Sequence, residues 1–136
     1  MPVAITLFYA SVLAVLFLVL SVRVVLLRRR LRVGVGTGGQ QTLELAVRAH
    51  ANFSEYVPLA LVMLLALEVG AGAPVWLLHL LGIMLVVGRV LHGLVGLNRG
   101  AGTSPGRFFG TLLTWLMLLV SAVTGLAVAF NGWLAA

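Results

Sequence analysis

The stretch that decides the fold is residues 44–58, Glu-Leu-Ala-Val-Arg-Ala-His-Ala-Asn-Phe-Ser-Glu-Tyr-Val-Pro, which places charged and amide side chains in an apolar sequence. Four of them recur every three or four residues: Glu44, Arg48, Asn52 and Glu55. At about 100° per residue, this spacing puts them on one face of a helix. Ionisable groups within a membrane segment are costly, so they face a bundle interior or a ligand. The stretch therefore predicts a membrane helix with a functional polar face.

The composition around this stretch is that of a membrane protein. The chain has 136 residues, of which 62% are hydrophobic, and a mean hydropathy of +1.17. This indicates one integral membrane domain over residues 1–136. The absence of cysteine excludes disulfides, thiolate metal sites and a cysteine nucleophile. The net charge of +6 comes from arginines at helix ends and inside helices, so we expect membrane lipid and no nucleic acid as a partner.

Hydropathy divides the chain into four spans, at about residues 3–31, 43–69, 75–97 and 107–133. We read the first as a retained helix, because no small-residue cleavage site follows it. Short loops between long spans predict an all-α, four-transmembrane-helix bundle of up-down topology. Pro58 should kink the second helix. The loop Gly34-Val-Gly-Thr-Gly-Gly39 matches the dinucleotide-binding glycine pattern, but no strand precedes it, so it is read as a linker.

The arginines set the expected topology. The first and third loops with their flanking segments hold the Arg-rich sequence, whereas the turn at residues 70–74 has no arginine. The positive-inside rule then places both Arg-rich loops in the cytoplasm and both termini on the opposite side. The run Arg28 to Arg30 is expected at anionic lipid head groups. The tryptophans are expected to anchor the chain in lipid or at the interface: Trp76, Trp115 and Trp133.

Arg89 is the strongest single candidate for a functional residue. It lies well inside the third span, where an arginine costs about 2.5–3.5 kcal/mol on insertion scales. One reading is contact with a ligand, and the other is a structural ion pair with Glu55. His92 follows it on a similar face. Small residues fall around the same arc and predict a close helix approach: Gly82, Gly93, Gly96 and Gly100.

Arg48, Asn52 and Glu55 offer a donor, an amide and an acceptor over roughly 10 Å of one helix face. This suits an extended zwitterionic ligand, since Arg forks match carboxylates. The alternative is a satisfied interhelical network. The histidine spacing gives no metal-ligand pattern, and the absence of Asp leaves no Ser/His/Asp triad. We therefore expect no metal.

The motif Arg48-x-x-x-Asn52-x-x-Glu55, within Asn52-Phe-Ser-Glu55-Tyr56-Val-Pro58, resembles the second-helix signature of the MAPEG family, the membrane-associated proteins in eicosanoid and glutathione metabolism. Arg89-x-x-His92 resembles the third-helix motif, and Arg48-Ala-His-Ala-Asn-Phe-x-Glu-Tyr56 is typical of bacterial members. The four-helix layout matches over nearly the whole chain. The second-helix motif is the specific part of this resemblance.

The resemblance implies a homotrimer in the bacterial inner membrane, with glutathione as co-substrate bound between subunits and a lipophilic small molecule as second substrate. The tripeptide would be bound by Arg48, Asn52, Glu55 and Tyr56, with Arg89 and His92 beside it. Arg23 resembles the first-helix arginine supplied by the adjacent subunit. Arg107, which opens the fourth helix, resembles the catalytic arginine that stabilises the thiolate. A nearby arginine and a helix N-terminus both favour a thiolate.

Two positions depart from the eicosanoid enzymes. Where those have an aromatic hydroxyl beyond the third-helix arginine, this chain has His92 and Gly96, and Phe108 replaces the serine that follows the fourth-helix arginine in the prostaglandin-type enzyme. Prostaglandin isomerase activity is therefore not expected.

The sequence favours a glutathione transferase or peroxidase. The alternatives are a non-enzymatic protein that binds lipid or another small ligand, a drug/proton antiporter that uses Glu55, and a haem protein that uses His50 and His92.

Overall fold

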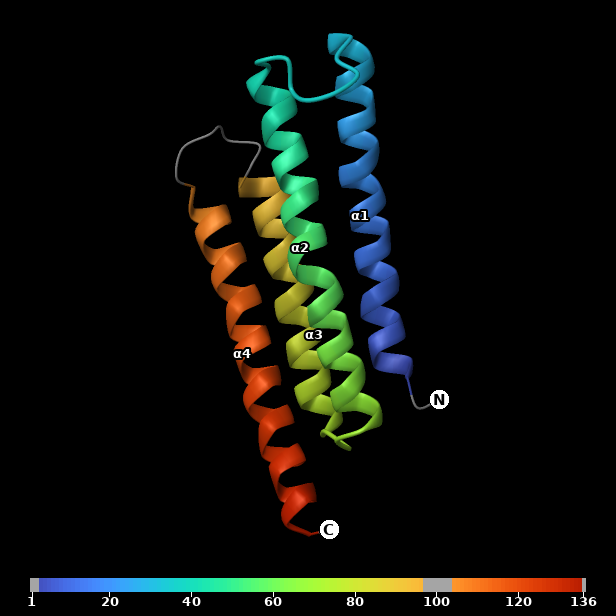
Figure 1. Cartoon of the computed structure of the whole chain (residues 1–136), viewed down its shortest axis with the longest axis vertical. Coiled ribbons are helices and arrows are strands. Elements are labelled where there is room, and N and C mark those ends of the chain that lie inside the picture. The colour runs from blue at the N-terminus through green and yellow to red at the C-terminus, as the bar shows by residue number, and fades with distance from the viewer. Residues whose placement is uncertain (1–2, 97–103, 136) are drawn as a thin grey trace.

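The computed structural model describes residues 3–96 and 104–135 as four long helices with short connections (Figure 1). The elements are α1 (Ala4–Leu31), α2 (Gln41–Val69), α3 (Val75–Val90), which continues as the π-helical segment η1 (Leu91–Gly96), and α4 (Pro105–Leu134). Successive helices run in opposite directions, so the expected up-down bundle is confirmed. Each span, with α3 and η1 taken together, is long and apolar enough to cross a membrane.

The helix ends lie close to the predicted ones, and two differences have physical causes. The fourth helix begins at Pro105, because proline fits the first turn of a helix and the Ser104 hydroxyl accepts a hydrogen bond from the Arg107 backbone N–H at 3.3 Å. The third helix widens into a π-helical segment at Leu91, which hydropathy cannot reveal. Its predicted last residue, Leu97, lies outside the described residues, as do Arg99 and Gly100.

The core lies where α1 and α3 meet α2. Tyr9, Leu13, Leu16 and Leu20 form the buried stripe of α1, at the spacing of one helix face. It packs in one cluster with apolar residues of α2 and α3, among them Phe53, Val57, Leu64, Leu81 and Leu85. The outward faces expose valine, leucine and phenylalanine along their whole length, as lipid-facing helices do.

α3 and α4 cross at two glycines. A Cβ placed on Gly110 would lie 2.6 Å from the Gly88 carbonyl oxygen and 2.7 Å from the His92 backbone nitrogen. Only glycine permits this approach, which brings the α4 backbone within reach of the Arg89 side chain. Of the predicted glycine arc, Gly82 receives the Tyr9 ring and Gly96 receives Arg107. The small residues therefore serve several partners rather than one helix.

Glu68 joins α2 to α1 at the end of the bundle near both termini. Its carboxylate accepts hydrogen bonds from the backbone N–H groups of Ile5 at 2.9 Å and Thr6 at 2.8 Å. These groups are unsatisfied donors of the first turn of α1, so a residue of α2 caps a different helix. Close by, the Tyr9 hydroxyl lies 3.0 Å from Nδ1 of His79 on α3. Nothing in the local sequence predicts this contact.

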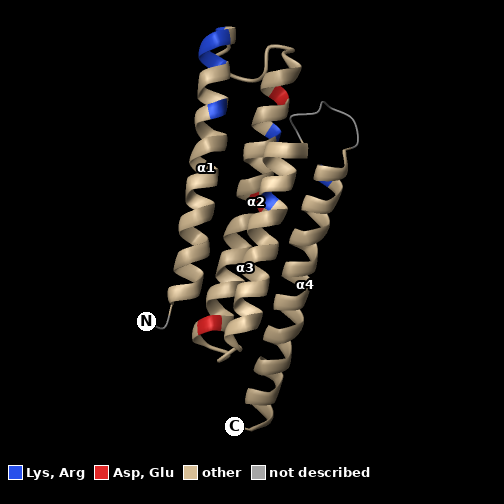
Figure 2. Ribbon diagram, turned by 180° about the vertical axis from the view of Figure 1, so that it is seen from behind, with Lys and Arg blue, Asp and Glu red and all other residues tan. Residues whose placement is uncertain are grey.

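The arginines gather in the half of the bundle away from the termini (Figure 2). Arg28 directs Nη1 at the loop carbonyls of Gly34 at 3.3 Å and Gly36 at 2.8 Å. The loop backbone turns through three glycines with positive φ, Gly36, Gly38 and Gly39, and Arg28 ties this loop to the end of α1. Arg29 and Arg30 are exposed, and their contact with lipid head groups stays a prediction.

Candidate functional site

Three of the predicted side chains, Arg48, Asn52 and Glu55, form a polar line on α2, and the charges at its two ends are exposed. Arg48 Nη1 lies 3.9 Å from Glu55 Oε1, and their side chains are 61% and 51% exposed. An exposed pair at this distance contributes little to stability, about 0–1 kcal/mol. Both charged groups therefore remain available to a ligand. Asn52 lies between them and is half-buried.

The Arg89 side chain approaches the same polar line from the interior of the bundle. It is 2% exposed, and Nη1 donates to Asn52 Oδ1 at 2.8 Å. Nη2 donates to the Thr114 hydroxyl at 2.7 Å and lies 3.4 Å from the Gly110 carbonyl oxygen. The ion pair between Arg89 and Glu55, one of the two readings of the sequence, is not formed, since Glu55 is turned towards Arg48. Arg89 thus joins α2, α3 and α4 in one network.

The Arg89 charge has only uncharged partners. Over residues 3–96 and 104–135, no carboxylate lies within 4.0 Å of its guanidinium. Nε is buried and has no hydrogen-bond partner. A cation held by amide, hydroxyl and carbonyl oxygens keeps its positive field, since no opposite charge cancels it. An anion beside the polar line of α2 is therefore favoured.

Tyr56 packs its ring against the Arg89 guanidinium. The Arg89 guanidinium carbon lies 5.5 Å from the centre of the Tyr56 ring, which is cation–π distance. The Tyr56 hydroxyl accepts a hydrogen bond from the Trp115 indole at 3.4 Å. Trp115, predicted as an anchor in lipid or at the interface, is more than half exposed and also holds this tyrosine. The tyrosine keeps its own O–H proton for another partner.

Arg107 and His92 lie where η1 meets the first turn of α4. A Cβ on Gly96 would come within 2.6 Å of Arg107 Cγ, so the arginine side chain passes directly over this glycine. His92 is 9% exposed, with its backbone against Gly110. Arg107 stands at a helix N-terminus, where the backbone N–H groups and the helix dipole also attract anions.

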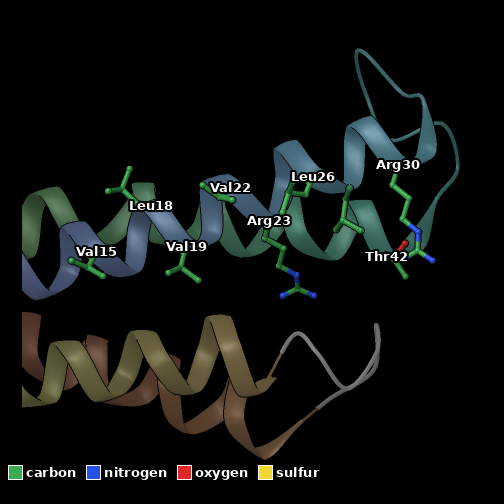
Figure 3. A pocket seen from close by; sticks show the side chains of 9 residues that line it. Val15, Leu18, Val19, Val22, Arg23, Leu26, Arg30 and Thr42 are labelled. Carbon is green, nitrogen blue, oxygen red and sulfur yellow. The ribbon is translucent and has the colours of Figure 1, made fainter.

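Arg23 lies apart from this network in the single chain. It lines an open groove of about 700 Å³ on the outward face of α1, together with Arg30 and Thr42. Figure 3 shows Arg23 and Arg30 on the same side of α1 as Val15 and Val19, further along the helix towards the α1–α2 loop. The structure gives Arg23 no hydrogen bond or ion pair to the polar line of α2 within the residues it describes.

Comparison with known proteins decides the family. The model of the MAPEG family matches residues 6–127.

The chain belongs to the MAPEG family.

Two curated relatives are Inner membrane protein YecN of Escherichia coli strain K12 and of Escherichia coli O6:H1. Each is 43% identical over 84 residues, an alignment that covers 62% of this chain and 63% of the relative. The chain therefore spans less than two thirds of the relatives it matches. Their name and the four spans support an integral inner-membrane location for this MAPEG chain.

Sequence reasoning missed two residues of the site in this MAPEG chain, Thr114 and Gly110. They lie on the buried face of α4, which recurs every three or four residues as Gly110, Thr114, Met117 and Ser121. Three of these four residues are small, which in an apolar helix is a signal that could have pointed to the site residues. Among the described parts of the chain, no group of three or more His, Cys, Asp or Glu side chains could hold a metal ion.

Proposed function

We propose that this MAPEG protein is a glutathione-dependent transferase or peroxidase of the inner membrane. The observation that carries the proposal is the exposed line of Arg48, Asn52 and Glu55 directly in front of Arg89, whose charge no carboxylate compensates. Membership of a family named for glutathione and eicosanoid metabolism adds to it. Glutathione is a zwitterionic tripeptide with two carboxylates and one ammonium group, which matches the signs of this line.

Each side chain of the line has a distinct task in this proposal. Arg48 binds a carboxylate of glutathione through its guanidinium fork. Glu55 accepts hydrogen bonds from the ammonium group, while Asn52 and Tyr56 bind polar groups between the charges. Opening the Arg48–Glu55 contact costs little, because both groups are exposed and 3.9 Å apart. Arg89 and His92 support the line from the interior.

Arg107 stabilises the thiolate of the bound tripeptide. A free thiol has a pKa of about 8.5, and an adjacent guanidinium lowers it. The sulfur then attacks an electrophilic carbon, a C–S bond forms and the leaving group departs with the bonding electrons. With a hydroperoxide, the sulfur attacks the terminal oxygen, which gives an alcohol and glutathione sulfenic acid. A second glutathione converts this sulfenic acid to the disulfide and water.

The site is completed by a second copy of the chain in a homotrimer. Arg23 is half-buried on α1 and makes no contact with the line in its own subunit. In the trimer, Arg23 of one subunit reaches the glutathione of the next. The Arg-rich loops face the cytoplasm, where glutathione is abundant, and both termini lie on the opposite side.

Subunit mixing tests this arrangement. We expect Arg23→Ala and Arg48→Ala homotrimers to lose glutathione conjugation to a lipophilic electrophile, and organic hydroperoxide reduction with it. Co-expression of the two variants places an intact Arg48 beside an intact Arg23 at some interfaces, so activity should return in part. Arg29→Ala, which changes an exposed α1 arginine outside the groove, is the matched control. No recovery in mixed trimers would contradict a site shared between subunits.

A second candidate function is non-enzymatic binding of a lipid or similar amphiphile. The observation that favours it is the α1 groove, in which an apolar wall ends at Arg23 and Arg30. Thermal stabilisation by an anionic amphiphile, with no turnover across a panel of electrophiles and hydroperoxides, would support this function over catalysis.

A further inference from the structure

The Asn52 amide can take only one orientation against Arg89. A guanidinium has donors and no acceptor, so the amide atom 2.8 Å from Arg89 Nη1 must be the oxygen. The amide nitrogen, with two N–H donors, then points away from Arg89. It makes no hydrogen bond to the residues that the structure describes, and it is not among the side-chain atoms sealed from solvent. Asn52 therefore offers donors, and not an acceptor, on its open side.

Thr114 holds Arg89 in place from α4. Its side chain is fully buried, and its hydroxyl donates to the Gly110 carbonyl oxygen at 2.9 Å. A hydroxyl has a single proton, so the side that faces Arg89 is a lone pair, 2.7 Å from Nη2. Arg89 is therefore the donor in both hydrogen bonds: one N–H group goes to Thr114 and another to Asn52.

We propose that Thr114 is a positioning residue that acts through Arg89 to turn the Asn52 NH₂ towards the ligand. The site then selects a ligand that places a hydrogen-bond acceptor, a carboxylate or carbonyl oxygen, at Asn52. A donor group there would meet the amide N–H groups with no partner, and a buried unpaired donor costs about 1–3 kcal/mol. The identity of the ligand as glutathione rests on the proposed function, whereas the orientation of Asn52 does not.

The variants follow from the hydrogen bonds. Thr114→Val removes the hydroxyl at constant shape, and Thr114→Ser restores it. Thr124→Val is the matched control, since Thr124 also donates to the carbonyl four residues earlier, Val120, at 2.8 Å but contacts no arginine. Asn52→Asp replaces the donor face with an acceptor and keeps an oxygen for Arg89. If Thr114→Val does not fold, Thr114→Ala replaces it in both measurements.

The first measurement needs no ligand. The chain has three asparagines, so asparagine-selective ¹⁵N labelling gives three side-chain NH₂ signals, and Asn52→Asp assigns one by its loss. We expect Thr114→Val to shift the Asn52 signal, and Thr114→Ser and Thr124→Val to leave it in place. An unchanged Asn52 signal in Thr114→Val overturns the proposal, whatever the protein binds.

The second measurement is the affinity for glutathione of the same variants. Thr114→Val should weaken binding about tenfold, a loss that Thr114→Ser rescues and Thr124→Val does not reproduce. Asn52→Asp should abolish binding while the fold is retained. Glutathione binding that survives Asn52→Asp unchanged contradicts the donor role of Asn52. If the wild-type protein does not bind glutathione but the Asn52 signal depends on Thr114, the proposed function fails and the positioning of Asn52 stands.

Discussion

Arg89 shows how this bundle keeps a charge in an apolar setting. A central arginine costs about 2.5–3.5 kcal/mol on insertion scales, and a hydrogen bond to a charged group returns about 1.5–3 kcal/mol. The two short bonds to Asn52 and Thr114 therefore offset the cost without a carboxylate. A salt bridge would offset it too, but it would cancel the positive field that the proposed anionic ligand would use.

At this scale, Arg107 carries a pH prediction. We expect Arg107→Ala to lower conjugation at pH 7 roughly thirtyfold, because only a few per cent of an unassisted thiol is ionised there. The rate of the variant should rise as the pH approaches about 8.5, whereas the wild-type rate should already have levelled off. Initial rates across this pH range, at saturating glutathione, check the expectation.

Two variants give the Arg107 experiment its control. Arg107→Lys keeps the charge and should recover part of the rate at neutral pH, and Arg29→Ala should match the wild type. Parallel pH profiles for Arg107→Ala and the wild type would show that Arg107 does not act on the thiol.

The sequence predicted contacts between site residues only where both residues lie in the same helix. The spacing in residues 44–58 places Arg48 and Glu55 on one helix face, and the structure has them 3.9 Å apart. Thr114 could not be found in this way, because it lies 25 positions from Arg89 along the chain and only helix packing brings the two together. Their roles towards glutathione stay a prediction.

Among the elements, the crossing of α3 and α4 sets the geometry of the site. Gly88 and Gly110 let the backbones of α3 and α4 touch. The Arg89 side chain therefore lies between the helices, within hydrogen-bond distance of Thr114. Immediately after Arg89, the chain widens into η1, and His92 of that segment packs on Gly110. A larger residue at either glycine would separate the two helices that hold the network.

Gly110→Ala tests this crossing. The added Cβ would lie 2.6 Å from the Gly88 carbonyl oxygen, so α4 must move away from α3. We expect a loss of about 1–3 kcal/mol in the free energy of unfolding, typical of overpacking, and weaker glutathione binding. Denaturant unfolding in detergent measures the first and calorimetry the second.

The control for this variant lies in the same helix. Nothing is within 4 Å of a Cβ added at Gly132, so Gly132→Ala should leave binding unchanged and stability unchanged or raised by up to about 1 kcal/mol. Equal effects of the two substitutions would mean that the close crossing does not matter.

Hydropathy predicted the four helices well, because lipid demands long apolar spans with satisfied backbones. It could not predict contacts between elements. Glu68 of α2 caps α1 through hydrogen bonds between positions more than 60 residues apart. Such caps contribute about 0.5–2 kcal/mol each and leave no mark in periodicity.

On the scale of the whole molecule, the charges divide the bundle into two halves (Figure 2). The arginine-rich half contains the loop between α1 and α2, and the other half contains the first turn of α1 and the end of α4. The positive-inside rule predicts that the arginine-rich half lies in the cytoplasm.

The absence of cysteine makes the orientation measurable. We expect a cysteine at Val35, which is 93% exposed in the α1–α2 loop, to escape a membrane-impermeant maleimide in intact spheroplasts. A cysteine at Leu134, near the end of α4, should react. After permeabilisation both should react, which is the control for accessibility. The reverse pattern in intact spheroplasts would place the Arg-rich loops outside.

The central claim is that the line of Arg48, Asn52 and Glu55 binds glutathione, and calorimetry of the detergent-purified protein tests it most directly. We predict micromolar-to-millimolar binding that is lost in Arg48→Ala and kept in Arg29→Ala. Absence of binding in a well-folded wild-type protein, or binding that Arg48→Ala leaves intact, would contradict the account.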